Sequence, residues 1–320
     1  MTLNRRSVLA GVAALTASPS AFAQAFPNKP IKIVVPFAAG SATDLTARGL
    51  GAKLQEILKQ PIVVDDKPGA SGQLGASAVA TAPADGYTLL MGTNSTNAAN
   101  TALFKKLSYD PDKDFAPIMR CVTGVNTLVV NNDLPVKTVA ELIDYARQNP
   151  GKLNYSEAST SQRLSAEMFN KMAGVKIERV PYKSSPQALG DVASGQVQVM
   201  FPDLPQALTQ IDAGRVRGLG TTGPQRTAVA PNLPAIAETV PGYSLVYWLA
   251  VFAPASTPKD VQKTLADAIA EALKDPATAK AMTQDRMDIS PLPLEQFAAY
   301  IKEQTTWWTT EIKAAGIEPE

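Results

Sequence analysis

The groups best suited to chemistry lie in a loop between a predicted strand and a predicted helix. Residues 31–48 read IKIVVPFAAGSATDLTAR, an apolar run that gives way to very small side chains and then to a helical pattern. The first turn of a helix has unpaired N–H groups and a partial positive charge, so it can bind a carboxylate without a basic side chain. Small side chains would let a ligand approach this backbone, although the same residues would also suit a tight packing turn. The ligand-binding interpretation places the site at Phe37, Ala38, Ala39, Gly40, Ser41, Ala42 and Thr43, with Asp44 stabilising the helix start.

The composition removes several kinds of catalytic site. The chain contains no histidine, so it lacks the commonest general base and the commonest metal ligand. Ser–His and Cys–His nucleophile pairs and His-based zinc sites are therefore excluded. A secreted hydrolase would need Ser41 activated by Lys183 or Lys67, and nothing in their spacing favours such a pair. We expect a binding protein rather than an enzyme.

The glycines of residues 69–75 invite comparison with a nucleotide-binding loop. Their spacing is Gly69-x-x-Gly72-x-x-Gly75, which is not G-x-G-x-x-G, and they do not follow the first predicted strand. We therefore expect no cofactor.

The first residues have the pattern of an export signal. They read MTLNRRSVLAGVAALTASPSAFAQ, with Arg5-Arg6 before an apolar run and Ala21-Phe22-Ala23 as an A-x-A cleavage signal. The apolar run, about ten residues, is too short to span a bilayer. The pattern predicts a signal peptide over residues 1–23, cleaved after Ala23, with either Sec or twin-arginine export; the alternative is a disordered cytosolic N-terminus.

Charge and length limit the remaining classes. The chain has 30 Lys and Arg against 29 Asp and Glu, and such a neutral surface argues against nucleic acid as a partner. Cys121 is the single cysteine, so no disulfide is expected. No segment after the signal is apolar enough to cross a membrane. A mature chain of about 300 residues suggests two domains held by ordinary hydrophobic cores.

Short β-like runs alternate with helical periodicity, which is typical of an α/β fold. Strands are predicted near residues 31–37, 62–65, 87–91, 118–130, 152–155, 197–201, 216–221 and 247–253. Helices are predicted near 44–59, around Leu74 and Val79, from the capping box at Thr138, around Leu164, Met168 and Met172, from Thr257, and over 297–312. The β-rich passages 118–130 and 247–253 are candidates for crossings between two lobes. This division gives a first lobe of residues 24–124 and 251–320 and a second lobe of residues 125–250.

Seven segments in order carry a family resemblance: FPNKPIKIVVPFAAGSATD, VVDDKPGASGQLGA, ADGYTLLMG, YDPDKDFAPI, LNYSEAST, VPYKSSPQAL and LAVFAPASTPKD. Together they resemble the Bug-type (TctC-like) solute receptors of tripartite tricarboxylate transporters, over essentially the whole mature chain. The resemblance implies a two-lobed periplasmic binding protein fold (type II-like) with two crossing hinge strands. It further implies a periplasmic receptor, expected to be a monomer, that captures a small organic acid and delivers it to a large and a small membrane subunit.

The family places its ligand between strand-to-helix loops that face each other across a cleft. This implies a second loop containing Thr93, Asn94 and Ser95, and a third loop on the other lobe containing Ser159, Thr160 and Ser161. Either could instead be an ordinary polar loop. The family's first loop is usually richer in Pro and Gly, so its shape here is expected to differ.

Arg163 stands where the family usually has histidine. Its guanidinium could form a bidentate pair with a ligand carboxylate, or it could form an i,i+4 salt bridge with Glu167. Tyr182 and Asp203 are further candidates; Tyr182 could contact the ligand body or belong to the core. Phe201-Pro202-Asp203 departs from the usual Phe-Asp-Asn, so a role for Asp203 is not simply inherited.

These loops suit a monocarboxylate or dicarboxylate better than a trianion. A ligand-dependent sensory partner of a membrane histidine kinase would have the same sequence features as a transport receptor. The sequence does not separate these two functions.

Overall fold

The computed structural model describes residues 26–284 and 286–320. The predicted signal peptide and its cleavage site therefore lie outside the described residues. Among the described helices, none combines the length and apolarity that a membrane span would need.

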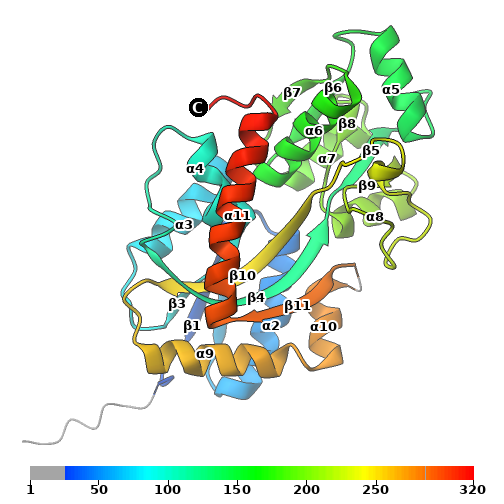
Figure 1. Ribbon diagram of the computed structural model, residues 1–320. Coiled ribbons are helices and arrows are strands. Elements are labelled where there is room, and N and C mark those ends of the chain that lie inside the picture. Colours follow the sequence, from blue (N-terminus) through cyan, green and yellow to red (C-terminus); the bar gives the residue numbers. More distant parts are fainter. Residues whose placement is uncertain (1–25, 285) are drawn as a thin grey trace, which may run out of the picture.

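The first lobe is built on a mixed six-stranded sheet in the order β11-β4-β10-β3-β1-β2 (Figure 1). Its strands are β1 (Ile31–Val35), β2 (Ile62–Asp66), β3 (Thr88–Thr93), β4 (Phe115–Val125), β10 (Val246–Pro254) and β11 (Asp288–Pro293). β1 pairs in parallel with β2 and β3, whereas β10 runs antiparallel to both β3 and β4. The parallel strands place the starts of their following helices at one edge of the sheet, where the first two predicted loops lie.

Helices cover both faces of this sheet. They are α2 (Ala42–Leu58), α3 (Gln73–Ala80), α4 (Asn100–Leu103), α9 (Lys259–Ala272), α10 (Pro276–Thr283) and α11 (Leu294–Ala314). Alternate side chains of β1 divide between the two layers: Ile33 packs in the core with α2 and α9, and Val34 packs in the core with α3 and α11. A strand buried on both faces in this way reads as a continuous apolar run in the sequence.

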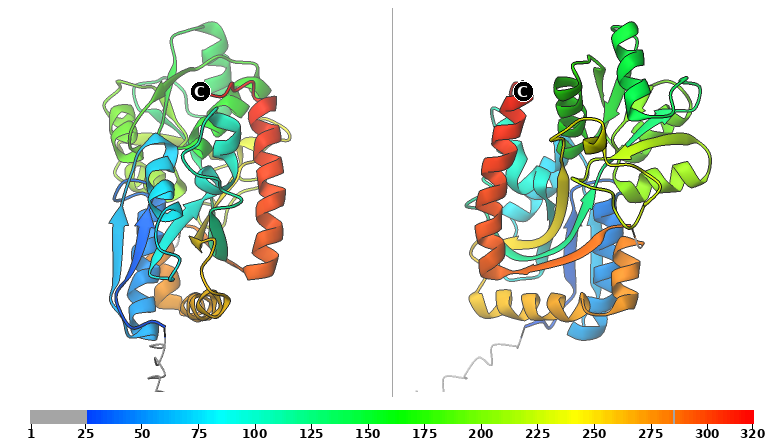
Figure 2. Two further views of the ribbon diagram at one scale, coloured as in Figure 1. Left: turned by 90° about the vertical axis from the view of Figure 1, so that its left-hand side faces the viewer. Right: turned by 45° about the vertical axis from the view of Figure 1, so that its right-hand side comes forward.

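The second lobe is built on a five-stranded sheet in the order β7-β6-β8-β5-β9. Its strands are β5 (Thr127–Asn131), β6 (Asn154–Glu157), β7 (Glu178–Pro181), β8 (Val199–Met200) and β9 (Val216–Thr221), and its helices are α5 (Val139–Gln148), α6 (Thr160–Ala173), α7 (Ser185–Ala193) and α8 (Leu204–Asp212). Figure 2 shows the two lobes one above the other, with α11 running along one side from the first lobe toward the second.

The passage 118–130, read from the sequence as one β-rich run, is divided between the two sheets. β4 ends at Val125 and β5 begins at Thr127, so the chain changes sheet at Asn126. The return crossing uses residues 222–245, and β10 itself lies wholly in the first sheet. Asn126 and Thr222 tie the two crossings together: the N–H of Asn126 donates to Thr222 Oγ1 at 2.9 Å, and the N–H of Thr222 donates to the Asn126 carbonyl at 2.9 Å. The first crossing lies next to the predicted boundary at residues 124–125, whereas the return crossing begins well before the predicted boundary at residues 250–251 and ends at residue 245. The lobe boundaries stay predictions.

Several predicted local features need adjustment. Leu74 and Met172, two of the apolar residues from which their helices were predicted, are 60% and 40% exposed. The Thr138 hydroxyl does accept the Glu141 N–H at 3.1 Å, but the Glu141 carboxylate accepts from the N–H of Lys137 rather than from that of Thr138. Helix α10 and strand β11 were not anticipated, because neither segment carries a clear apolar period.

Candidate ligand-binding site

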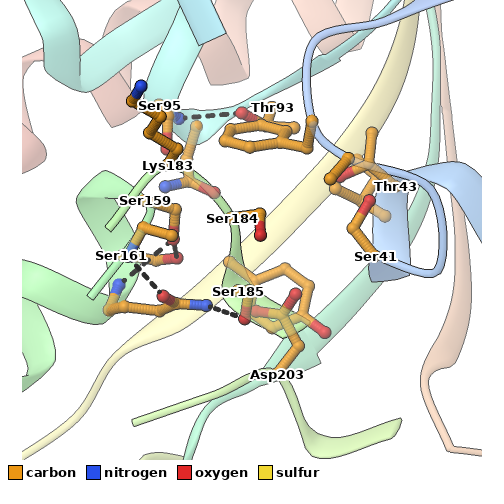
Figure 3. A pocket seen from close by; sticks show the side chains of 17 residues that line it. Ser41, Thr43, Thr93, Ser95, Ser159, Ser161, Lys183, Ser184, Ser185 and Asp203 are labelled. Atoms are coloured by element: carbon orange, nitrogen blue, oxygen red, sulfur yellow. Dashed lines mark hydrogen bonds between the residues drawn. The ribbon is translucent and has the colours of Figure 1, made fainter. Parts of the chain in front are cut away.

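A narrow cavity of about 30 Å³ lies where the two lobes meet; we call it the first cavity. Residues predicted for the site that line it are Phe37, Ala38, Ser41, Thr43, Thr93, Asn94, Ser95, Ser159, Ser161 and Asp203. Residues that were not predicted for the site but also line it are Ala158, Gln162, Lys183, Ser184, Ser185, Tyr247 and Leu249. Figure 3 shows Ser41 and Thr43 from the first lobe on the side opposite Ser159 and Ser161 from the second. The structure thus brings together three loops that are far apart in the sequence.

The start of α2 leaves backbone donors available. Ser41 is its N-cap, and its Oγ accepts the N–H of Asp44 at 3.2 Å, while the Asp44 carboxylate accepts the N–H of Gly40 at 2.8 Å. Asp44 therefore stabilises the loop, as expected. The N–H groups of Ala42 and Thr43, the first two residues of α2, have no acceptor among the described residues. They are hydrogen-bond donors at the start of a helix, where an anion is favoured.

The start of α6 repeats this arrangement on the second lobe. Ser159 is the N-cap, its Oγ accepts the N–H of Gln162 at 3.5 Å, and it lies 3.1 Å from Ser161 Oγ. The N–H of Ala158 is used by Gln162 Oε1 at 2.8 Å. The N–H groups of Thr160 and Ser161 have no acceptor in the described part of the chain. The N-termini of α2 and α6, one from each lobe, therefore flank the first cavity and contribute a positive potential to it.

The loop after β3 supplies a side-chain donor. Thr93 Oγ1 accepts the N–H of Ser95 at 3.1 Å, and the N–H of Thr93 donates to Thr96 Oγ1 at 3.0 Å, so these groups hold the turn. Asn94 is 2% exposed, and its Nδ2 has no hydrogen-bond partner within the described residues. A buried amide without a partner is costly, because it has lost its water and gained nothing in exchange. It is a vacant hydrogen-bond donor at the cavity wall.

Strand β10 contributes a second unsatisfied group. Tyr247 and Leu249 lie two residues apart on the same face of the strand and both line the first cavity. Tyr247 is 2% exposed, and its buried hydroxyl has no hydrogen-bond partner among the described residues. The aromatic ring also packs against the backbone of Gly124, where a Cβ would lie 2.5 Å from the ring. The hydroxyl is therefore held in a fixed place beside the cavity.

Asp203 places a carboxylate in the same cavity. It is the N-cap of α8, and its Oδ1 accepts from Asn126 Nδ2 at 3.1 Å, while that same amide donates to the Phe201 carbonyl at 2.9 Å. Burial raises the pKa of Asp203 to about 6, against the effect of the Asn126 hydrogen bond. None of the ion pairs formed by the described residues includes this carboxylate. The cavity therefore combines the N-termini of α2 and α6 with one acid, which lies at the start of α8 and has no cationic partner among the described residues.

Hydrogen bonds join the lobes around the first cavity. Gln162 Nε2 donates to Ser185 Oγ at 2.9 Å, Ser185 donates to Gln206 Oε1 at 2.7 Å, and Gln206 Nε2 donates to the Gly40 carbonyl at 3.1 Å. The Thr160 hydroxyl, predicted to bind ligand, donates instead to Asn100 Oδ1 at 3.1 Å, across the lobe boundary. The two lobes are thus in direct contact at the rim of the cavity.

Two predicted residues, Arg163 and Tyr182, lie elsewhere. They line a larger neighbouring cavity of about 200 Å³, which we call the second cavity. Arg163 Nη1 pairs with Glu320 Oε1 at 2.6 Å and not with Glu167. It lines the second cavity and not the first, and its pairing with a ligand carboxylate stays a prediction. The Tyr182 hydroxyl donates to Asp191 at 2.6 Å. Among the remaining predicted residues, Ala39, Gly40 and Ala42 support the first loop without lining the first cavity.

The residues considered for catalysis are placed and bonded as follows. The Ser41 hydroxyl is used as a helix cap, and no hydrogen bond among the described residues links it to Lys183 or Lys67. Lys67 instead pairs with Asp65 at 3.3 Å. Within residues 26–284 and 286–320, no group of three or more His, Cys, Asp or Glu side chains could hold a metal ion.

Two α/β lobes joined by two crossings, with a polar cavity between two helix N-termini, define the class of bilobal solute-binding proteins. Residues 46–317 match the family described as "Tripartite tricarboxylate transporter family receptor", TctC. The chain therefore belongs to this receptor family, and the resemblance noted in the sequence is confirmed.

Solved structures with the same fold are similar over almost their whole length. Rpa4515 of R. palustris with adipate has a TM-score of 0.89 and 36% identity, covering 92% of this chain and 100% of that one. The periplasmic binding protein BugD has a TM-score of 0.87 and 30% identity, covering 92% and 100%. MatC from Rhodopseudomonas palustris with bound malate has a TM-score of 0.83 and 30% identity, covering 90% and 100%. The predicted α/β, two-lobed periplasmic binding protein fold is thereby confirmed.

Proposed function

We propose that this protein is a periplasmic receptor that captures a small organic carboxylate between its lobes and passes it to the membrane subunits of a tripartite tricarboxylate transporter. The work is binding, so no catalytic group is needed. Family membership and the adipate and malate in two similar structures support the carboxylate. The signal-peptide pattern before Gln24 supports export to the periplasm.

One observation supports the proposal above all: unpaired donors from both lobes surround the same small space. Thr43 of the first lobe and Ser161 of the second both line the first cavity, and their N–H groups have no acceptor among the described residues. The N–H groups of Ala42 and Thr160, the preceding residues, likewise have no described acceptor. Asn94 Nδ2 adds a buried side-chain donor. A carboxylate has about four lone-pair sites, so it can accept hydrogen bonds from both lobes at once.

This arrangement makes binding and closure the same event. A carboxylate bound to α2 alone would use half of the available donors, and it would acquire the rest only when α6 approaches. The first cavity, at about 30 Å³, has room for roughly two water molecules. A complete ligand therefore enters while the lobes are apart, and its carboxylate is enclosed when the lobes meet around it. The chain crossings at Asn126 and Thr222 are where we place the hinge.

The direct test is a thermal-shift and calorimetric screen of residues 24–320 against carboxylates such as malate, succinate, glutarate and adipate. Binding to the folded state alone adds roughly 2.7 kcal/mol of stability at 100 times the dissociation constant. The uncharged diamides of the same acids are the ligand controls. If none of these acids raises the unfolding midpoint above its amide, and no amino acid in the comparison described below binds either, carboxylate binding is ruled out.

A matched pair of variants tests the site. Asn94→Asp replaces the vacant donor with an acceptor of the same shape and adds a negative charge, so the affinity for any carboxylate should fall by at least tenfold. Asn132→Asp makes the same change on the exposed surface of the second lobe and should leave the affinity unchanged.

Delivery to the transporter is then tested by deleting the gene and measuring uptake of the bound acid. Unchanged uptake with lost induction would replace transport by sensing.

A further inference from the structure

The first cavity is not a simple anion site, because it contains an acid. Among the described residues that line it, Asp203 is the sole acidic side chain and Lys183 the sole basic one. Lys183 is exposed at the rim, and no ion pair joins it to Asp203 among the described residues. A ligand carrying negative charge alone would therefore meet both the helix N-termini, which attract it, and Asp203, which repels it.

The state of Asp203 makes this conflict sharper. Because the pKa of Asp203 is raised to about 6 by burial, most molecules carry the ionised form at neutral pH. Asp203 lies at the N-terminus of α8, but its side chain makes no capping hydrogen bond there, and its one described hydrogen-bond partner is the neutral amide of Asn126, at 3.1 Å from Oδ1. An ionised carboxylate that has lost part of its hydration and has no counter-ion is costly. A cation supplied by the ligand would remove this cost.

The size of the cavity limits how far apart the two ligand charges can be. Thr43 of α2, Ser161 of α6 and Asp203 line one space of about 30 Å³. Both charged groups of the ligand must therefore be only a few atoms apart. The vacant Tyr247 hydroxyl lines the same space and can hydrogen-bond to either group.

We propose that the ligand is an α-amino acid, whose carboxylate binds the N-termini of α2 and α6 and whose ammonium group binds Asp203. This inference rests on the proposed function and specifies its ligand class. An α-amino acid carries its two charged groups on one carbon atom, as the small cavity requires. The rest of the ligand extends past Phe37, Ala158 and Lys183, which line both the first and the second cavity.

The test compares acids that differ only in the α-ammonium group. The probes are L-alanine and propionate, L-aspartate and succinate, L-glutamate and glutarate, and L-phenylalanine and 3-phenylpropionate, measured by calorimetry at pH 7.5. We expect at least one amino acid to bind on the order of ten- to a hundredfold more tightly than its partner, as a charge-assisted hydrogen bond provides. D-malate and L-malate, with a neutral hydroxyl, should lie between aspartate and succinate if that series binds.

Asp203→Asn should abolish the preference for the amino acid and leave the affinity for the partner acid equal or higher. The variant is of the same shape and can still accept from Asn126, so folding should be preserved. Asp144→Asn, which removes an exposed carboxylate on α5 of the same lobe, is the control and should keep the preference.

The outcomes separate this inference from the proposed function. If the acids lacking the ammonium group bind as tightly as the amino acids in every pair that binds, the α-amino acid assignment is wrong and carboxylate capture stands. A preference that survives in Asp203→Asn would also overturn the assignment. If neither set binds, and the carboxylate screen above is also negative, both proposals fail.

Discussion

Replacing Asp203 by asparagine should make the unliganded protein more stable, and the gain should depend on pH. Burial raises the pKa of Asp203 from 3.8 to about 6 in the folded protein. Between these two values the folded chain binds more protons than the unfolded chain, so the free energy of unfolding falls as pH rises through this window. Each unit of difference between the folded and unfolded pKa corresponds to 1.36 kcal/mol, so this difference lowers the free energy of unfolding by about 3 kcal/mol once Asp203 is fully ionised. Because the side chain is in part accessible to water, we expect about 2 kcal/mol.

The measurement is urea-induced unfolding of both proteins at pH 4, 5, 6, 7 and 8, followed by tryptophan fluorescence. Asp203→Asn and the wild type should have nearly equal free energies of unfolding at pH 4, where native Asp203 is protonated. By pH 7 the free energy of unfolding of the variant should exceed that of the wild type by about 2 kcal/mol, and this difference should not grow at higher pH. Asp144→Asn, on the exposed face of α5, should differ from the wild type by less than about 0.5 kcal/mol at every pH. A difference that stays flat with pH, or a variant less stable than the wild type at pH 7, would refute the reasoning.

Further predictions concern other parts of the molecule. Tyr247→Phe removes a buried hydroxyl without a partner, so urea unfolding should show equal or slightly higher stability while calorimetry shows affinity reduced by roughly tenfold. Gly92→Ala would place a Cβ 2.6 Å from the ring of Phe252, and urea unfolding should show a loss of about 1–3 kcal/mol. Burial raises the pKa of Cys121 to about 12, so a thiol reagent at pH 8 should react at the rate of unfolding rather than at the rate for a free thiol. Glu320→Gln weakens two ion pairs between the lobes, with Arg163 and Arg179, and X-ray scattering should show a larger radius of gyration for the unliganded variant at low salt, with the difference vanishing at high salt.

The elements around the first loop were predictable because their signals are local. The apolar run of β1, the N-cap at Ser41 and the periodicity of α2 all lie within a few residues of one another. They placed the helix start within two residues of its position at Ala42. The hydroxyl-rich starts of the loops at Thr93 and Ser159 were found in the same way, with the family resemblance indicating that they face each other.

The remaining site residues depend on contacts between distant parts of the chain. Tyr247 and Leu249 were assigned to a strand, but strand alternation does not say which face meets the other lobe. Lys183, with the serines after it, was not singled out for binding because the position of the loop after β7 is set by the sheet order. Arg163 reaches Glu320, 157 residues away in the sequence, and no local pattern could indicate that partner.

The position of Asn126 has a consequence for how this receptor can evolve. Its backbone joins the two crossings through Thr222, and its side chain joins Phe201 and Asp203. Asn126, at the proposed hinge, is thus also the neighbour of Asp203, the acid that we expect to select the ligand. A substitution at position 203 should therefore alter both which solute is preferred and how readily the empty protein closes. Lineages that acquire a new solute preference through position 203 should carry compensating changes at the proposed hinge residues. The effects of such paired changes on the binding free energy should not be additive.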